Sequence, residues 1–220
     1  RLLAETMVGI GRSYDTPVRA VLTDMSQPLG RAVGHACEVA EGIEVLRGGG
    51  PADLLEVTYR LAEEMLLLGG VAADRAEARA RLEGAVASGA AFAKLVEVVE
   101  AQGGDPAVVH DPALLARAPG ETIVTAPREG YLARADALDI GVAAVRLGAG
   151  RERKEDPIDP GVGITVLVKV GDRIEMGEPL ARLTWSDPAR LERALPLVER
   201  AFALADEPVA PPPLIRGEVP

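Results

Sequence analysis

The chain has little of several things that would point to particular functions. Cys37 is the single cysteine among 220 residues, so no intrachain disulfide can form, and a reducing compartment such as the cytoplasm is the expected location. No apolar run reaches the roughly 20 residues that span a bilayer, and the first residues lack the basic, apolar and small-residue order of a signal peptide. We therefore expect neither export nor membrane insertion.

Positive charge is also scarce. The 24 basic residues are outnumbered by 34 acidic ones, and they are interspersed with these acids along the chain. Binding to nucleic acid phosphates requires clustered Lys and Arg, so nucleic acid is not an expected partner. Three of the basic residues are lysines: Lys94, Lys154 and Lys169. The 48% hydrophobic content is enough for a substantial core in one or two domains.

The first half of the chain has the hydrophobic spacing of helices and one clear strand. The apolar run Val18–Leu22 predicts that strand, and helical spacing follows in the runs 36–46, 51–68, 74–86 and 92–99. Asp74 with Glu77 three residues later is typical of a capping box. One strand is too few for a doubly wound sheet, so we expect the other strands upstream of Arg1. The chain is expected to be a piece of a longer polypeptide.

From about residue 119 the hydrophobic period changes to that of strands. Short β-like runs are predicted at 121–126, 131–135, 142–147, 164–170 and 180–185. The run 168–180 places Gly-Asp and Gly-Glu turns between apolar strands, a pattern typical of a barrel-sandwich module. Ser186, Asp187 and Pro188 predict a helix start, and Pro196 kinks that helix or divides it in two. The predicted fold class is α/β, or α+β for the segment taken by itself.

Three stretches resemble the pyrimidine-nucleoside phosphorylase and thymidine phosphorylase family. They are Thr23-Asp24-Met25-Ser26-Gln27-Pro28-Leu29-Gly30, Gly148-Ala149-Gly150-Arg151 and Ile158-Asp159-Pro160-Gly161-Val162-Gly163. The resemblance covers nearly all of the chain but only the C-terminal half of the family. It implies that residues 1–117 are the C-terminal part of a central α/β domain and that 118–207 are a β-rich C-terminal domain. Residues 208–220, which hold five prolines, are expected to form an extended tail.

The resemblance also implies a function for the complete polypeptide. In this family, phosphate attacks the anomeric carbon of a pyrimidine nucleoside and releases the base and a pentose 1-phosphate. The residues that hold phosphate and base would lie before Arg1, so we assign no catalytic or substrate-binding residue here, and we expect this segment alone to be inactive. It would supply a scaffold and a closing lobe. The full-length protein is expected to be a homodimer that pairs chiefly through the absent helical domain.

A potassium site is the one site that the resemblance carries onto this chain. The family's ligands match the backbone carbonyls of Leu29 and Ala32 and the carboxylate of Glu41. Oxygen donors suit a hard cation, and carbonyls in a turn before a helix have no intrahelical partner. The alternative stays open, because helical spacing puts Glu41 opposite the apolar stripe of the helix 36–46, where a solvated glutamate would also be expected.

Other residues have structural explanations that compete with functional ones. Asp24 either faces a ligand or caps its turn, and His35 either contacts an anion or packs at a helix start. The Gly148–Arg151 stretch is a weak match to a phosphate cradle and is interpreted as a connection between β elements. As an alternative function, the run 168–180 also resembles biotinyl and lipoyl carriers, although Lys169 lies within a predicted strand rather than on a hairpin. A non-catalytic binding module is a further alternative.

Overall fold

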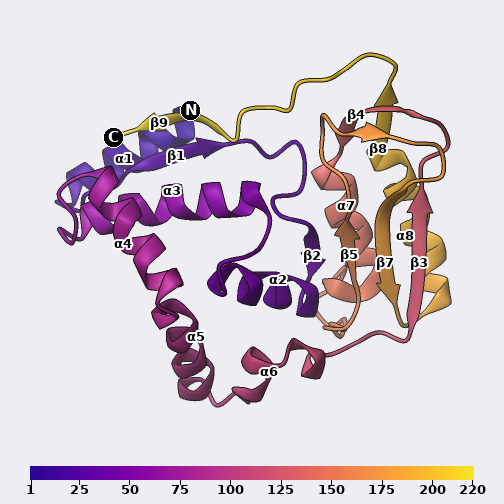
Figure 1. The fold of residues 1–220 in the computed structure, drawn as a ribbon, viewed down its shortest axis with the longest axis horizontal. Helices are drawn as coiled ribbons and strands as arrows, with labels where there is room; N and C mark the ends of the chain where they lie inside the picture. Colours follow the sequence, from indigo (N-terminus) through magenta and orange to yellow (C-terminus); the bar gives the residue numbers. More distant parts are fainter.

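Helices dominate the chain up to residue 114, and antiparallel strands dominate from residue 120 (Figure 1). The computed structural model describes all of residues 1–220. The helix-rich region contains α1 (Leu2–Ser13), β1 (Ala20–Thr23), β2 (Ala32–Gly34), α2 (Ala36–Leu46), α3 (Ala52–Leu68), α4 (Arg75–Ala87), α5 (Ala90–Ala101), α6 (Ala107–His110) and the 3-10 turn η1 (Pro112–Leu114). None of the helices has the length and apolar character needed to cross a membrane.

The β-rich region adds two long helices to its strands. It contains β3 (Gly120–Thr125), β4 (Gly130–Ala135), α7 (Ala137–Ala144), the π-helical turn η2 (Val145–Ala149), β5 (Gly163–Val166), β6 (Arg173–Ile174), β7 (Pro179–Trp185), α8 (Pro188–Ala201) and β8 (Phe202–Ala205). The tail then returns to the helix-rich region and forms β9 (Ile215–Val219). The mixed α/β class, with a helix-rich part before a β-rich part, is as predicted.

Two of the three sheets join the regions. The four-stranded sheet has the order β2-β5-β7-β3, so β2 of the helix-rich region is its edge strand, with Val33 opposite Ile164. The tail strand β9 pairs with β1 and puts Glu218 opposite Val21. A third sheet, β6-β4-β8, lies within the β-rich region. The proposed division at residue 117 and the separate tail remain predictions, and both borders are crossed by strand pairing.

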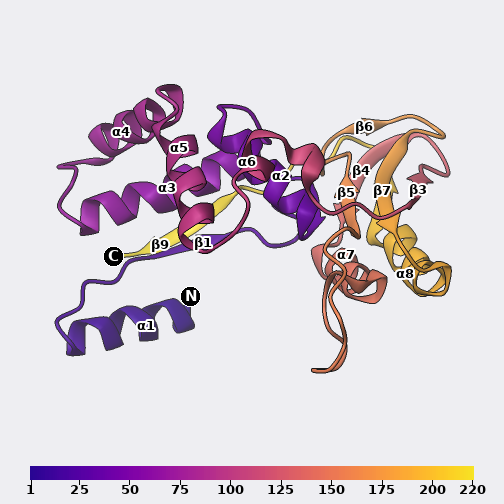
Figure 2. The ribbon, with the colours of Figure 1, turned by 90° about the horizontal axis from the view of Figure 1, so that it is seen from below.

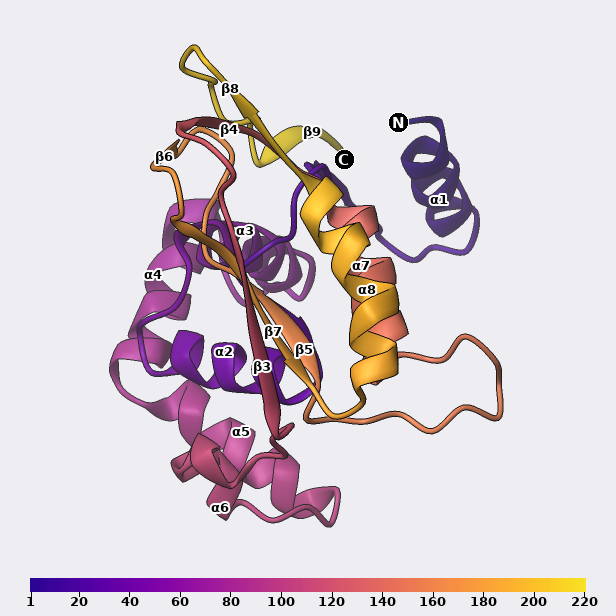
Figure 3. The same cartoon turned by 90° about the vertical axis from the view of Figure 1, so that its right-hand side faces the viewer.

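The apolar core lies in the β-rich region. Helices α7 and α8 cover one face of the four-stranded sheet (Figure 3), and a cluster of fifteen buried residues fills the space between them. Ile140, Ile164, Leu183 and Val198 of this cluster are fully buried. A second cluster of six residues, centred on Leu132, lies under the three-stranded sheet. Burying this apolar surface is the main favourable contribution to the stability of the region.

The predicted strand at 142–147 is wrong, because these residues are helical. Asp136 caps α7 by accepting a hydrogen bond from the amide of Asp139 (3.0 Å). Ile140, Ala143 and Leu147 then follow at helical spacing and are buried against the sheet. A short apolar run does not by itself distinguish a buried strand from a buried helix, and the packing of this run against the sheet decides for the helix.

The end of the β-rich region also differs from the prediction in detail. Pro196 lies inside α8, which continues unbroken to Ala201, so this proline does not divide the helix. Phe202, expected on the same helix, begins strand β8 instead. The predicted cap at Asp187 is confirmed by its bond from the amide of Ala189 (2.8 Å).

The predicted cap of α4 at Asp74 is confirmed, whereas the reciprocal bond of the capping box goes to the amide of Ala73 instead of that of Asp74. Asp74 accepts a hydrogen bond from the amide of Glu77 (2.9 Å), and Glu77 accepts one from the amide of Ala73 (2.8 Å). Each carboxylate satisfies an amide that has no partner within the helix. Local chemistry therefore fixed this helix start as predicted.

Ion pairs add to the β1–β9 strand pairing in holding the tail to the helix-rich region. Arg60 and Glu64 of α3 are buried and contact each other, and Glu64 also accepts hydrogen bonds from Arg19 (2.6 Å) and Arg75 (3.0 Å). Glu218 of β9 lies 2.7 Å from Arg60. Burial by itself would raise the pKa of Glu64, but its hydrogen bonds with the three arginines outweigh burial and lower the pKa to about 2.

Helix α1 lies apart from the other helices, beyond β1 and β9 (Figure 2). Val8 is its one buried apolar side chain, whereas Leu3, Met7 and Ile10 are 72, 55 and 55% exposed. A helix with one solvated face normally places polar residues on it. The exposed apolar residues of α1 are consistent with the expectation that further elements of a longer polypeptide cover it.

Candidate functional site

The segment Gln27–Ala32 lies at the junction of the two regions, immediately before and within the start of β2. Pro28 and Gly30 are buried, whereas the Leu29 side chain is 40% exposed. Gly30 has a positive φ of 67°, and a Cβ at this position would overlap with Oε2 of Glu41. Glycine is therefore required here both by the backbone conformation and by the close approach of a carboxylate.

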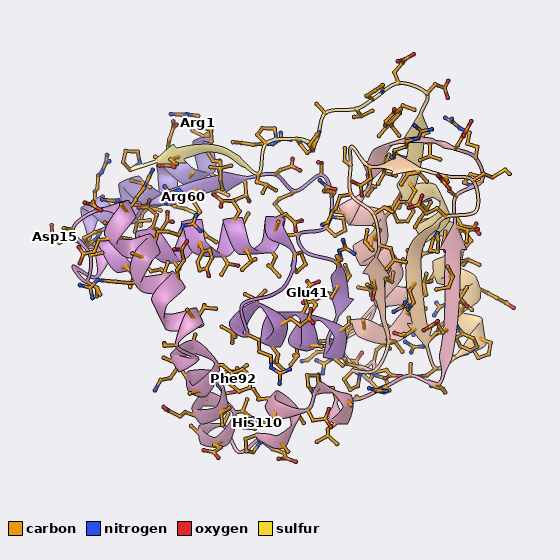
Figure 4. All side chains as sticks on the ribbon, viewed as in Figure 1. Arg1, Asp15, Glu41, Arg60, Phe92 and His110 are labelled. Atoms are coloured by element: carbon orange, nitrogen blue, oxygen red, sulfur yellow. The ribbon has the colours of Figure 1, made fainter.

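The amide groups of this junction segment are bound by carboxylates of the helix-rich region. Oε1 of Glu41 accepts hydrogen bonds from the amides of Arg31 (2.9 Å) and Ala32 (3.2 Å). Oδ2 of Asp53 accepts one from the amide of Gly30 (3.2 Å). Figure 4 shows Glu41 on the side of α2 that is turned toward α3. The Glu41 carboxylate is therefore bound to the chain, and the solvated alternative does not describe it.

The carbonyl groups of the same segment are bound by donors of the β-rich region. Nζ of Lys169 donates to the carbonyls of Pro28 (2.7 Å) and Gly30, and to Oδ2 of Asp53 (2.6 Å). The amide of Val166 donates to the carbonyl of Arg31 (2.8 Å). The junction segment is thus held on one side by acids of α2 and α3 and on the other by the turn after β5.

Three carbonyls of the junction segment are left over, those of Gln27, Leu29 and Ala32, and the last two are the predicted potassium ligands. Leu29 O accepts no hydrogen bond. In an antiparallel pair the hydrogen bonds alternate, and the bond to Arg31 O therefore leaves Ala32 O on the open edge of β2. Oε2 of Glu41 is likewise unused, since both of its accepted bonds end on Oε1. The three predicted donors are thus without other partners, two of them on the junction segment and the third on α2 beside it.

The predicted ligands are of the chemical type that a hard monovalent cation binds. Two carbonyls and one carboxylate are oxygen ligands, which such ions prefer. No group of three His, Cys, Asp or Glu side chains comes together anywhere in the chain, so a transition-metal site is not indicated. Whether Leu29, Ala32 and Glu41 bind potassium stays a prediction.

Sequence reasoning did not identify Lys169 and Asp53 as members of this site. Lys169 was expected inside a strand, but β5 ends at Val166, and Lys169 lies in a tight turn where its amide donates to Asp172 (2.7 Å). The indication in the sequence that could have pointed to Lys169 was that lysine is rare. Arginine fills 21 of the 24 basic positions, so each of the three lysines stands out.

Asp24 has a structural role. Its carboxylate accepts hydrogen bonds from the amide (3.2 Å) and hydroxyl (2.6 Å) of Ser26 and from Arg216 of the tail. Burial opposes ionisation, yet these bonds outweigh it and lower the pKa of Asp24 below its usual value. Of the two roles considered for this residue, capping the turn is the one observed.

The glycine-rich stretch at 148–151 is not arranged as a phosphate cradle. Gly148 O accepts the amide of Asp159 (2.9 Å), and Ala149 O lies 2.6 Å from Nε2 of His35. A phosphate cradle needs convergent N–H groups, whereas this stretch presents carbonyls to its neighbours. His35 is an exposed residue whose ring nitrogen links the start of α2 to the end of η2, and the stretch follows a helix rather than joining strands.

Cys37 is a packed residue. Its sulfur lies against the backbone of Gly34 and Gly163, where β2 pairs with β5. Burial raises the pKa of the Cys37 thiol, so the reactive thiolate form is disfavoured. Cys37 therefore fills space where the two strands meet.

Comparison with known protein families matches both regions of the chain. Residues 1–92 match the α/β domain of a glycosyl transferase family, and residues 131–205 match the pyrimidine nucleoside phosphorylase C-terminal domain. The chain is 42% identical over 209 residues to the pyrimidine-nucleoside phosphorylase of Bacillus subtilis (strain 168). It is 40% identical over 209 residues to the enzyme of the same name from Staphylococcus aureus (strain USA300).

These alignments cover 95% of the chain and 48% of each relative, so the chain spans about half the length of the curated relatives it matches. The two matched domains follow each other in the order in which the structure has its helix-rich and β-rich regions. The chain therefore belongs to the pyrimidine nucleoside phosphorylase family, of which it carries the C-terminal portion.

Proposed function

We propose that the complete polypeptide is a pyrimidine-nucleoside phosphorylase, which converts a pyrimidine nucleoside and phosphate to the free base and a pentose 1-phosphate. The observation that carries the proposal is the 42% identity with the Bacillus subtilis enzyme over nearly the whole chain. Catalysis of such a displacement depends on positioning phosphate and on stabilising the charge that develops on sugar and base. Phosphate is then the co-substrate, and the nucleoside the ligand.

This chain contributes the scaffold, the closing lobe and part of a potassium site in that proposal. The catalytic and substrate-binding residues belong to the half of the family that precedes residue 1, and the enzyme is a cytoplasmic homodimer. A monovalent cation bound by Leu29, Ala32 and Glu41 would attach the junction segment to the phosphate-binding half. The unused carbonyl of Leu29 and the carboxylate packed against Gly30 support this role.

The test is phosphate-dependent release of uracil or thymine, with and without potassium, by this chain alone and by the complete polypeptide of its gene. Activity is expected in the complete polypeptide, with an increase on adding potassium, and is not expected in the chain alone. Glu41→Gln should raise the potassium concentration for half-maximal rate at least about tenfold, because a neutral amide is a weaker ligand than a carboxylate.

Glu44→Gln is the matched control, since Glu44 lies on the same helix with an exposed side chain. It should leave both the rate and the potassium dependence unchanged. No phosphorolysis by the complete polypeptide would sink the enzymatic proposal and leave a non-catalytic binding module. A biotinyl- or lipoyl-type carrier is disfavoured, because a carrier displays its lysine on a hairpin, whereas the Lys169 side chain is 21% exposed and held by three oxygens.

A further inference from the structure

Lys169 has all its hydrogen-bonding capacity used by the junction segment and its neighbour. An ammonium group has three N–H donors and no acceptor. In this structure it meets three oxygens, Pro28 O, Gly30 O and Oδ2 of Asp53. The ion pair with Asp53 is largely shielded from solvent, with the two side chains 21 and 18% exposed. A shielded, charge-assisted contact of this kind fixes geometry more strongly than a surface ion pair does.

The three oxygens suit a compact cation. Ammonium is a small point charge on a flexible stem, whereas guanidinium is a wide planar fork. The chain uses arginine at 21 of 24 basic positions and lysine at this one. The choice of lysine fits the close spacing of two carbonyls that are two residues apart on a buried turn.

The two carbonyls that Lys169 binds lie on either side of Leu29. Pro28 O and Gly30 O belong to the peptide planes on either side of the Leu29–Gly30 peptide, and the amide of that middle peptide, Gly30 N, donates to the same Asp53 that pairs with Lys169; together these contacts constrain the direction in which Leu29 O faces. The same turn continues directly into Ala32, whose amide is bound by Glu41. The lysine thus acts on the predicted cation ligands through the backbone, without being a ligand.

We propose that Lys169 is a positioning residue for the cation site: by filling the cage of Pro28 O, Gly30 O and Asp53, it holds Leu29 O and Ala32 O in the orientation that binds the ion. This inference rests on the proposed function, which supplies the potassium ion, and on the observed contacts of Lys169, which supply the geometry. Because Lys169 belongs to the turn after β5, the position of the β-rich region and the geometry of the cation site are coupled.

The experiment uses the complete polypeptide and measures phosphorolysis against potassium concentration. Lys169→Met keeps the length of the stem and removes the charge. The potassium concentration for half-maximal rate should rise at least about tenfold, a larger change than in the maximal rate, because the lost contacts organise the site rather than touch the substrate. A variant that merely destabilised the protein would lower the maximal rate and leave the potassium constant unchanged.

Two further variants keep the test decisive. Lys154→Met removes a lysine from an exposed loop and should change neither constant. Asp53→Asn keeps the shape of the cage and weakens its hold on the ammonium, so it should shift the potassium constant in the same direction even if Lys169→Met fails to fold. The effects of Asp53→Asn and Lys169→Met should be less than additive, because both remove the same contact.

A second readout does not depend on activity. Hydrogen exchange of the amides of Gly30, Arg31 and Ala32 should accelerate in Lys169→Met, while the amides of α8 stay protected. Unchanged exchange in the junction segment, or an unchanged potassium constant in an enzyme that responds to potassium, overturns the Lys169 proposal alone. An inactive complete polypeptide, or one that is indifferent to potassium, overturns instead the proposed function or its cation site, and the positioning role then falls with that site.

Discussion

The two regions of this chain are stabilised in different ways. The β-rich region buries two apolar clusters, of fifteen and six residues, between its sheets and helices. The helix-rich region has no such cluster; it buries the charged residues Arg60, Glu63 and Glu64 and exposes Leu3, Met7 and Met65. The β-rich region therefore carries an apolar core of its own, whereas the helix-rich region is held by its buried ion pairs and by the pairing of the tail with β1.

The largest expected difference comes from truncating a buried apolar side chain of the β-rich region and an exposed one of the helix-rich region. Leu183→Ala should destabilise the β-rich region by about 3 kcal/mol, because Leu183 is fully buried between β7 and the helices and its loss leaves a cavity. Met65→Ala on α3, where the side chain is 72% exposed, should cost less than about 0.5 kcal/mol.

Urea unfolding of the 220-residue chain measures both changes, with far-ultraviolet circular dichroism following the helix-rich region that contains Met65. The fluorescence of Trp185, the single tryptophan, reports on the β-rich region because it lies on β7 and packs against the larger cluster. Equal costs for Leu183→Ala and Met65→Ala would show that the contrast between the regions is wrong.

The second prediction concerns pH and the ion pairs. Glu64 has its pKa lowered to about 2 in the folded chain from an ordinary value of 4.5, so its contribution to stability is present above about pH 4.5 and is lost as the pH falls toward 2. The contribution is on the order of 3 kcal/mol, since each unit of pKa corresponds to about 1.4 kcal/mol. Glu64→Gln should remove this part of the acid dependence of the helix-rich region, as read by far-ultraviolet circular dichroism.

Glu121→Gln is the control for Glu64→Gln. Glu121 also faces an arginine, Arg182, but the two side chains are 58 and 47% exposed and 3.6 Å apart. An exposed pair contributes little, so this variant should keep the wild-type acid profile within about 0.5 kcal/mol. If the two variants lose the same acid sensitivity, the buried network is not what holds the helix-rich region.

The smallest effects should come from helix caps, one in each region. Asp74→Ala removes the cap of α4, and Asp187→Ala removes the cap of α8. Each should cost about 1 kcal/mol, because an amide at the helix start loses its acceptor. Trp185 fluorescence should follow the loss at Asp187, and circular dichroism should follow the loss at Asp74. Glu155→Ala, in an exposed loop, is the control and should change neither signal.

Much of the local structure could be predicted because short-range chemistry decides it. The cap at Asp74 and the strand that became β1 are encoded within a few residues. The run 142–147 was mistaken for a strand because its residues are apolar enough for either element, and the packing of Ile140 and Leu147 against the sheet decided for a helix. Apolar periodicity is informative only when one face of an element is polar.

The residues of the candidate site likewise divide into those that could be assigned from the sequence and those that could not. Leu29, Ala32 and Glu41 were assigned from the family resemblance, and Gly30 was part of the matched motif. Lys169 was not assigned, because it lies 139 residues away from the Gly30 carbonyl that it binds. No local pattern marks a side chain whose partners are backbone carbonyls of a distant turn.

The sequence by itself determined the family, the order of a helix-rich part and a β-rich part, the helix caps and the glycine that the junction turn requires. These depend on periodicity and on contacts between neighbours in the chain. The tertiary structure decided that β2 and β9 connect the regions, that Glu64 lies among three arginines, and that Lys169 holds the turn at Leu29. Such features depend on which distant segments meet, and that is set by the burial of apolar surface over the whole chain rather than by any one stretch of it.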